Sequence, residues 1–348
     1  MKIAERERPP GGTDRDSRAP TALGFGGAAI GNLYRPVSDA AAGAAVTEAW
    51  SHGVRYFDTA PHYGFGLGEE RLGAALKRLD PHGEAVISTK VGRLLTPVTT
   101  TARERHGFVD APALEPVFDY SHDGVLRSFE ESLKRLGRDR VDMLFAHDLG
   151  EATHGPAHAE RWSEFIGGGY RALRRLRDEH VVGAIGLGVN EWQVCEQAMA
   201  EGEFDVFLLA GRYTLLEQTA LASFLPRCAG RGVSVIVGGP FNSGVLACAS
   251  PSKAHYDYGA PPEWVSTKVA ALRAACADWS VELPAAALQF PLAHPQVISV
   301  IPGVADADEA GIAARRMAAS IPAGFWAELV ERGLIDPAAP LPVAEKAA

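Results

Sequence analysis

Short apolar runs alternate with longer amphipathic segments along most of this chain. Seven runs are rich in β-branched side chains and show no polar alternation, which is typical of strands buried on both faces. These runs are Val54–Thr59, Ala85–Val91, Val141–His147, Ala184–Asn190, Val206–Ala210, Val233–Gly238 and Val297–Ile301. A weaker, glycine-rich candidate strand, Thr21–Ile30, precedes them.

Helical patterns lie between these runs, and three of them have readable ends. Ser38 and Ser121 are the expected N-caps of two helices, and Gly53 and Gly137 are the expected stops. A third helix opens at a pair of prolines and covers about residues 261–278.

Eight strand candidates that alternate with about eight helices predict a single (β/α)8 TIM barrel. An open, doubly wound parallel sheet is the alternative for the same pattern. The long connections 92–120 and 240–259 interrupt the rhythm, and in a barrel they follow strands on the face that carries active sites. We expect the barrel to occupy residues 20–335, with flexible tails at 1–19 and 336–348.

Composition narrows the class of protein. The chain has 348 residues, 47% of them hydrophobic, which excludes a disordered or fibrous protein. Its net charge of −9 argues against nucleic-acid binding, since phosphate contacts need a basic face. The four cysteines are too scattered for a metal site, and the N-terminal segment has no apolar stretch, so we expect reduced thiols, no bound metal, no membrane anchor and a cytoplasmic location. The sequence leaves open whether the protein is a monomer or a homo-oligomer.

The ends of three neighbouring predicted strands carry an unusual combination of polar residues. Asp58, Lys90 and His147 each end an apolar run, and Tyr63 follows shortly after Asp58. An ammonium near a phenol favours the phenolate, and a carboxylate keeps that ammonium charged and in place. Each residue alone has a structural explanation, as an ion pair, a core ring or a buried histidine. Together they predict a site in which Tyr63 exchanges a proton with a substrate oxygen that His147 orients.

Several longer motifs resemble the aldo-keto reductase family. They run from LGFGGAAIGNLY through GVRYFDTAPHYG, SLKRLGRDRVDMLFAHD and GPFNSGVL to VIPGV, and so span nearly the whole chain. The family's four catalytic residues correspond to Asp58, Tyr63, Lys90 and His147, and all four residue types match. The resemblance implies a barrel that binds a nicotinamide dinucleotide without a Rossmann domain.

The resemblance also implies a set of dinucleotide contacts, some of which depart from the family pattern. Val189 stands where the family has Ser before Asn190, and Gly238 stands where it often has an aromatic ring that stacks on the nicotinamide. The segment 239–246 matches the loop around the pyrophosphate, where small residues suit a close approach of phosphate. The residues that the resemblance assigns to the cofactor are Asn190, Gly239, Pro240, Phe241, Asn242, Ser243, Gly244, Leu246, Ile301, Pro302, Gly303 and Glu309.

The segment that binds adenosine in the family favours NAD over NADP. Many relatives have a Lys or Arg there for the 2′-phosphate of NADP, whereas this chain has Ala305 with Asp306 and Asp308 beside it. A dianionic phosphate would meet carboxylates instead of a cation. We therefore expect NAD as the preferred cofactor and NADP as the alternative, unless Arg315 and Arg316 turn back toward the site.

Within the family, stretches such as VFDYSHDGVLRSFEESLKRLG and AHYDYGAPPE are similar to a branch of aldose and pyridoxal dehydrogenases. This likeness implies oxidation of a sugar such as L-fucose or a D-threo-aldose at C1 to the lactone. The alternatives are a pyridoxal 4-dehydrogenase, a generic NADP-dependent aldehyde or ketone reductase, a lyase that forms a Schiff base on Lys90, and a non-catalytic dinucleotide-binding subunit. The candidate residues for the substrate pocket are His62, Phe65, Trp192, Tyr256 and Tyr258.

Overall fold

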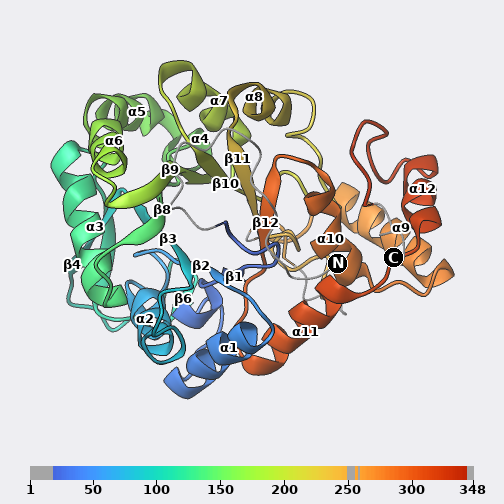
Figure 1. The fold of residues 1–348 in the computed structure, drawn as a ribbon, viewed down its shortest axis with the longest axis horizontal. Helices are drawn as coiled ribbons and strands as arrows, with labels where there is room; N and C mark the ends of the chain where they lie inside the picture. Colours follow the sequence, from blue (N-terminus) through green and yellow to red (C-terminus); the bar gives the residue numbers. More distant parts are fainter. Residues whose placement is uncertain (1–18, 249–254, 258, 343–348) are drawn as a thin grey trace.

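The computed structural model describes residues 19–248, 255–257 and 259–342, and eight of its strands form a parallel barrel surrounded by helices (Figure 1). Main-chain hydrogen bonds of 2.9 Å from Gly24 N to Val300 O and from Val300 N to Ala22 O close the barrel. The strands, in spatial order, are β1 (Phe25–Gly26), β2 (Tyr56–Asp58), β3 (Val86–Val91), β8 (Val141–His147), β9 (Val182–Val189), β10 (Val206–Ala210), β11 (Ser234–Gly238) and β12 (Val297–Ile301). Each predicted strand became a barrel strand, so the (β/α)8 prediction is confirmed and the open sheet is excluded.

The helices begin and end close to the expected residues. Ser38 Oγ accepts from Ala41 N at 3.2 Å, Ser121 Oγ accepts from Gly124 N at 3.0 Å, and Gly137 ends its helix with φ 60°. The helices are α1 (Asp39–Ser51), α2 (Leu67–Leu79), α3 (His122–Leu136), α4 (Glu151–His154), α5 (His158–Glu164), α6 (Tyr170–Asp178), α7 (Trp192–Glu201), α8 (Phe224–Arg231), α9 (Glu263–Asp278), α10 (Leu283–Gln289), α11 (Ala307–Ala318) and α12 (Ala323–Glu331).

The strands bury both faces, and alternate residues divide between two cores. One core fills the barrel and takes inward-facing residues from every barrel strand except β1; the other lies between strands and helices. On β2, for example, Tyr56 belongs to the inner core and Phe57 to the outer one. On β8, Met143 and Phe145 face inward. The two cores explain why the strands read as continuous apolar runs.

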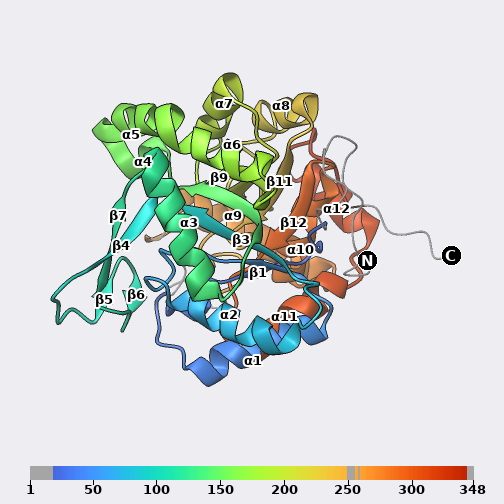
Figure 2. The ribbon, with the colours of Figure 1, turned by 60° about the vertical axis from the view of Figure 1, so that its left-hand side comes forward.

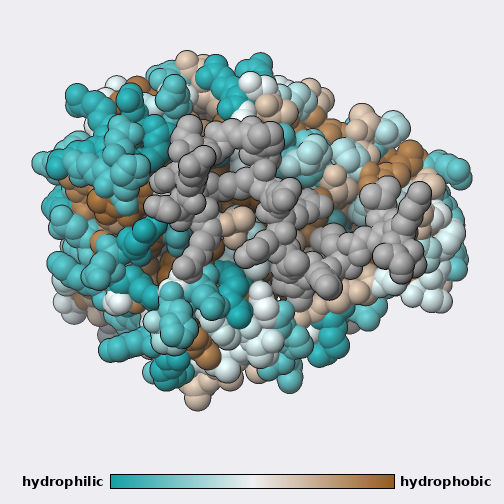
Figure 3. Space-filling model, viewed as in Figure 1, coloured by the Kyte–Doolittle hydropathy of each residue, from teal (hydrophilic) through white to brown (hydrophobic). Residues whose placement is uncertain are grey.

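A long excursion follows β3 and projects from the barrel (Figure 2). It contains an antiparallel pair, β4 (Arg93–Pro97) with β7 (Leu114–Phe118), and a shorter pair, β5 (Glu104–Arg105) with β6 (Phe108–Val109). Tyr34 N donates to the carbonyl of Gly107 at 2.9 Å, which ties the excursion to the β1–α1 connection. On the face seen in Figure 3, hydrophilic residues prevail on the left and lower part of the view, and more hydrophobic residues appear on the right.

The predicted tails lie largely outside the described residues, which exclude 1–18 and 343–348. Ala339 is buried and Leu341 packs against the core, so packing continues past residue 335. Within the described part of the chain, no helix combines the length and the apolar character needed to cross a bilayer.

Candidate active site

Polar side chains end the inward-facing rows of three adjacent strands. Asp58 is the last residue of β2, Lys90 lies next to the end of β3, and His147 ends β8. Tyr63 follows β2 in a turn. Because the three strands are parallel neighbours, their carboxyl ends meet at one part of the barrel mouth. The structure thus brings together the residues that the sequence predicted to meet.

Lys90 is the centre of this group. Its Nζ lies 2.7 Å from Asp58 Oδ2, 3.0 Å from Tyr63 Oη and 3.0 Å from the carbonyl of Thr59. The side chains of Lys90 and Asp58 are only 1% and 2% exposed. These three contacts match the three N–H donors of an ammonium, a form that carries no lone pair for attack on a carbonyl.

A line of hydrogen bonds continues from this pair into the barrel. Ser88 Oγ donates to Asp58 Oδ1 at 2.7 Å, and Tyr56 Oη lies 2.9 Å from Ser88 Oγ. Burial raises the pKa of Asp58, whereas the contacts with Lys90 and Ser88 act against that rise. The carboxylate is therefore held from two sides and positions Lys90 against Tyr63.

His147 stands edge-on to Tyr63, with ring centroids 5.8 Å apart and planes at 85°. Burial, together with the nearby charges of Arg93 and Lys90, lowers the pKa of His147 well below its usual range. Its main-chain carbonyl accepts from Tyr120 Oη at 2.6 Å, which fixes the end of β8. A neutral imidazole beside the phenol is able to donate a hydrogen bond to an oxygen that Tyr63 also contacts.

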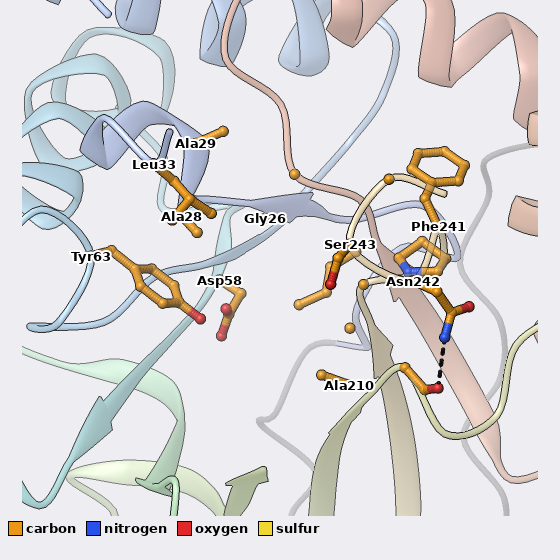
Figure 4. A pocket seen from close by; sticks show the side chains of 18 of the residues that line it. Gly26, Ala28, Ala29, Leu33, Asp58, Tyr63, Ala210, Phe241, Asn242 and Ser243 are labelled. Atoms are coloured by element: carbon orange, nitrogen blue, oxygen red, sulfur yellow. Dashed lines mark hydrogen bonds between the residues drawn. The ribbon is translucent and has the colours of Figure 1, made fainter. Parts of the chain in front are cut away.

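A cavity of about 590 Å³ opens beside Tyr63 and Asp58 (Figure 4). This volume lies within the range of small-molecule sites. Most of the predicted cofactor residues line it: Asn190, Gly239, Pro240, Phe241, Asn242, Ser243, Gly244, Ile301, Gly303 and Glu309. Leu246 and Pro302 are not part of the lining, and Leu246 is buried in the outer core.

The segment after β11 forms a tight loop across one side of the cavity. Three successive residues have positive φ angles, namely Asn242 at 47°, Ser243 at 56° and Gly244 at 99°. Residues held in such conformations cluster at functional sites. The side chain of Asn242 serves the loop itself, since its Nδ2 donates to Gly211 O at 2.9 Å and its Oδ1 accepts from Thr214 Oγ1 at 2.7 Å.

The lining fits a nicotinamide dinucleotide. Apart from the adjacent residues in the chain, a Cβ on Gly239 would come no closer than 4.0 Å to another residue, one on Gly303 no closer than 3.9 Å, and one on Gly244 would meet nothing within 4 Å. The backbone there is therefore open to a ligand. Such bare backbone suits phosphate groups. Asn190 adds an amide to the lining, and Gly238 with Leu208 leaves the ring-stacking position without an aromatic side chain.

A cluster of charged side chains lies where the cavity reaches the start of α11. The sequence pointed to its acidic residues but not to its cation. Glu309 Oε2 accepts from Ala305 N and Asp306 Oδ1 accepts from Glu309 N, so the carboxylates cap the helix. Arg35, from the β1–α1 connection, lies 3.1 Å from Asp306 Oδ2 and 2.8 Å from Glu309 Oε1. The hydrogen bond from the Glu309 amide, assisted by Arg35, lowers the pKa of Asp306.

The two arginines considered from the sequence do not turn back toward the cavity. Arg316 Nε donates to Glu282 Oε2 at 2.9 Å, and Arg315 is exposed on α11. The cation at this end is Arg35 instead, which lies 271 positions from Asp306 along the chain. No local pattern signals such a pairing, and the same holds for Leu33, Tyr34 and Asp257, which also line the cavity.

The predicted substrate residues divide into two groups. His62 and Phe65 lie beside the Tyr63 group. The ring centroid of His62 is 6.0 Å from that of His147 and 6.2 Å from that of Phe65, and Phe65 is fully buried. Trp192 and Tyr256 are packed against the core, and Tyr256 Oη donates to Glu217 Oε1 at 2.8 Å. None of these four side chains is part of the lining of the cavity. Tyr258 lies outside the described residues.

Known proteins match the chain over most of its length. Residues 22–331 match the model of the aldo/keto reductase family. The chain is 42% identical over 331 residues to pyridoxal 4-dehydrogenase of Microbacterium luteolum, covering 90% of this chain and 94% of that one. It is 41% identical over 321 residues to D-threo-aldose 1-dehydrogenase of a Pseudomonas species, with the same coverage.

A solved structure supports the fold independently. An aldo-keto reductase from Bacillus halodurans in its holo form superposes with a TM-score of 0.71 at 23% identity, covering 98% of both chains. At this identity the likeness concerns the fold alone.

Proposed function

Since the chain belongs to the aldo/keto reductase family and is an NAD(P)-dependent oxidoreductase, we propose that it oxidises an aldose at C1 to the lactone. L-Fucose and D-threo-aldoses are the proposed substrates. The observation that carries the proposal is the buried contact of 3.0 Å between Lys90 Nζ and Tyr63 Oη, backed by Asp58. The likeness to D-threo-aldose 1-dehydrogenase supports the choice of substrate.

The residues have distinct proposed roles in this reaction. Tyr63 as phenolate takes the proton of the anomeric hydroxyl, so that the C1–O bond gains double-bond character as C1 loses its hydride. Lys90 stabilises the phenolate through its ammonium, and Asp58 holds that ammonium in place. His147 donates a hydrogen bond to the same oxygen and orients the sugar. When bound, the dinucleotide supplies the acceptor for the hydride.

The dinucleotide would be held by the lining of the cavity. Asn190 is the proposed partner of the nicotinamide amide group, and the segment 239–244 with Gly303 would hold the phosphates. Glu309 and Asp306 favour NAD, because a 2′-phosphate would meet two carboxylates. Arg35 is already paired with both of them and offsets only one of the two charges.

A pyridoxal 4-dehydrogenase is the second candidate, and it rests on an identity of 42% to such an enzyme. The same residues serve both reactions, because pyridoxal also reacts as a cyclic hemiacetal whose hydroxyl loses a proton. A generic NADP-dependent reductase is the third candidate. A Schiff base on Lys90 fits less well, since all three donors of Nζ are engaged. A non-catalytic subunit and the cytoplasmic location stay predictions from the sequence.

A substrate panel tests the proposal. The purified protein is incubated with NAD or NADP and with L-fucose, D-galactose, D-arabinose or pyridoxal, and dinucleotide reduction is followed at 340 nm. We expect the highest kcat/KM with NAD and one of the sugars, and lactone as the product. Highest turnover with pyridoxal would replace the aldose by the second candidate. Turnover only in the reductive direction with NADPH and simple aldehydes would overturn both.

A further inference from the structure

An ion pair lies between the two histidines at the barrel mouth. Arg93 donates through Nη2 to Asp148 Oδ2, and its Nη1 lies 3.1 Å from His62 Nδ1. Asp148 Oδ2 in turn lies 3.6 Å from His147 Nε2. The side chains of Arg93 and Asp148 are 10% and 21% exposed. The contacts thus run His62–Arg93–Asp148–His147 around one side of Tyr63.

Each member of this chain of contacts sits next to a residue of the proposed catalytic group. His62 precedes Tyr63, Arg93 follows Lys90 by three positions, and Asp148 follows His147. Asp148 adopts φ 51° and donates its N–H to Gly188 O at 2.9 Å. A non-glycine residue held in this region is strained, which indicates a constrained position.

Arg93 is fixed from further sides by the projecting excursion and by α3. Its guanidinium lies 4.4 Å from the ring centroid of Phe118, and Ser128 Oγ donates to its carbonyl at 3.0 Å. The pair is therefore built into the fold and is not a chance contact of two flexible side chains.

The chemistry of the guanidinium determines the tautomer of His62. A guanidinium has donors only, so His62 Nδ1 must accept and its single proton must sit on Nε2. Burial and the charge of Arg93 lower the pKa of His62 to about 2, so the ring stays neutral. Phe108, at 5.3 Å and 87° between ring planes, packs edge-to-face against it.

We propose that Arg93 and Asp148 are positioning residues for the oxidoreductase reaction: together they fix the tautomer of His62 and keep His147 neutral for its hydrogen bond to the substrate oxygen. The inference rests on the proposed function, since it assumes that His147 contacts that oxygen. The positive charge of Arg93 and the negative charge of Asp148 cancel beside His147. Alone, the guanidinium would lower the pKa of His147 and the carboxylate would raise it. The charged and titratable groups that face His147 are His62 and Tyr63 after β2, Lys90 on β3, Arg93 on β4, Tyr120 before α3 and Asp148 after β8.

Opposite charge changes should therefore move the pH profile in opposite directions. Oxidation requires an ionised Tyr63 and a neutral His147, so its rate falls as either group takes up a proton at low pH. Arg93→Gln leaves the Asp148 carboxylate without its positive partner. The unbalanced negative charge favours protonation of His147 and Tyr63 and moves the acidic limb of kcat/KM to higher pH. Asp148→Asn leaves the guanidinium unbalanced and moves the limb to lower pH. Each shift should be about one pH unit, as for a neighbouring charge in a buried site.

The experiment measures kcat/KM against pH with saturating dinucleotide for the wild type, both single variants and the double variant Arg93→Gln/Asp148→Asn. The double variant restores the charge balance, so its limb should return to within about a third of a pH unit of the wild type. Arg138→Gln is the matched control. It breaks a half-buried pair with Asp80, at 3.3 Å, before β3 and at the opposite end of the barrel, and should leave the profile in place.

Shifts in the same direction, or a double variant that deviates more than either single variant, would overturn the proposal. If a single variant does not fold, the wild type provides a second test through ¹⁵N NMR of its labelled histidines. His62, assigned with His62→Gln, should be neutral and protonated on Nε2 from pH 5 to 8, and His147 should be neutral at pH 7. A His62 proton on Nδ1 would contradict the inference. No turnover with any substrate would refute the proposed function instead, while the tautomers would still be measured.

Discussion

Replacing Glu309 by Gln should relax the discrimination against NADP. Glu309 lines the cavity, accepts the amide of Ala305 and binds Arg35 at 2.8 Å. A glutamine is nearly isosteric and its oxygen keeps the bond to Ala305, but its amide donors then face Arg35. The change removes one negative charge and one of the two ion pairs that engage Arg35, which itself lines the cavity. Asp306 keeps its capping bond to the helix, so the fold should be preserved.

The magnitude follows from the charges at this end of the cavity. A 2′-phosphate carries about −1.5 to −2. At about 5 Å in a water-like medium each pair of unit charges contributes ~0.8 kcal/mol, so one carboxylate disfavours the phosphate by ~1.5 kcal/mol. Salt at 0.1 M, with a Debye length of about 10 Å, reduces this to ~1 kcal/mol. Together with the freed Arg35, we expect the ratio of kcat/KM for NADP to that for NAD to rise about tenfold.

The assay compares this ratio for the wild type, Glu309→Gln and the double variant Glu309→Gln/Arg35→Gln, at low and high ionic strength. In the wild type two carboxylates and one guanidinium give this site a net charge of −1, and in the double variant the remaining carboxylate of Asp306 gives the same net charge. The ratio for the double variant should therefore fall back toward the wild-type value. The control is Asp308→Asn, an exposed carboxylate of the same helical turn that does not line the cavity. The reasoning is refuted if the ratio stays constant in Glu309→Gln, or if Asp308→Asn changes it equally.

Three further variants test other parts of the site. Tyr63→Phe should lower kcat by about 10²–10⁴-fold through loss of the proton acceptor, with dinucleotide affinity unchanged in a fluorescence titration; a near-normal kcat would remove Tyr63 from the mechanism. Because His62 has its pKa lowered to about 2 in the folded state against about 6.5 unfolded, its contribution to stability is lost as the pH falls below about 6.5. Urea unfolding at pH 6 and pH 5 should therefore show that the wild type loses about 1 kcal/mol more than His62→Gln, and equal losses would contradict a buried neutral ring. Gly244→Ala, at φ 99°, should strain the loop by about 1–3 kcal/mol and raise KM for the dinucleotide. The control Gly230→Ala, on α8 with no neighbour within 4 Å of its Cβ, should leave KM unchanged. Similar KM values for both variants would argue against a phosphate-holding loop.

The sequence determined the barrel because each strand can be recognised from a short run of neighbouring residues. Seven buried apolar runs and one weaker, glycine-rich strand, separated by helical segments, admit few architectures. The helix caps at Ser38 and Ser121 depend only on neighbouring residues. The ends of the apolar runs also placed Asp58, Lys90 and His147 at neighbouring strand ends, and the parallel order of β2, β3 and β8 brings them together at the mouth.

Only the tertiary structure decided which charges face one another across the mouth and the cavity. Arg35 reaches α11 from the other end of the chain, and Arg93 reaches Asp148 from an excursion whose path no periodicity fixes. Trp192 and Tyr256 are partly buried against the core, a contact that the sequence pattern alone did not indicate. Ion pairs of this kind depend on the geometry of loops, and loop geometry is set by contacts between segments far apart in the chain. The residues that determine a strand or a helix are close together in the sequence, whereas the ion-pair partner of a long charged side chain can lie anywhere along the chain.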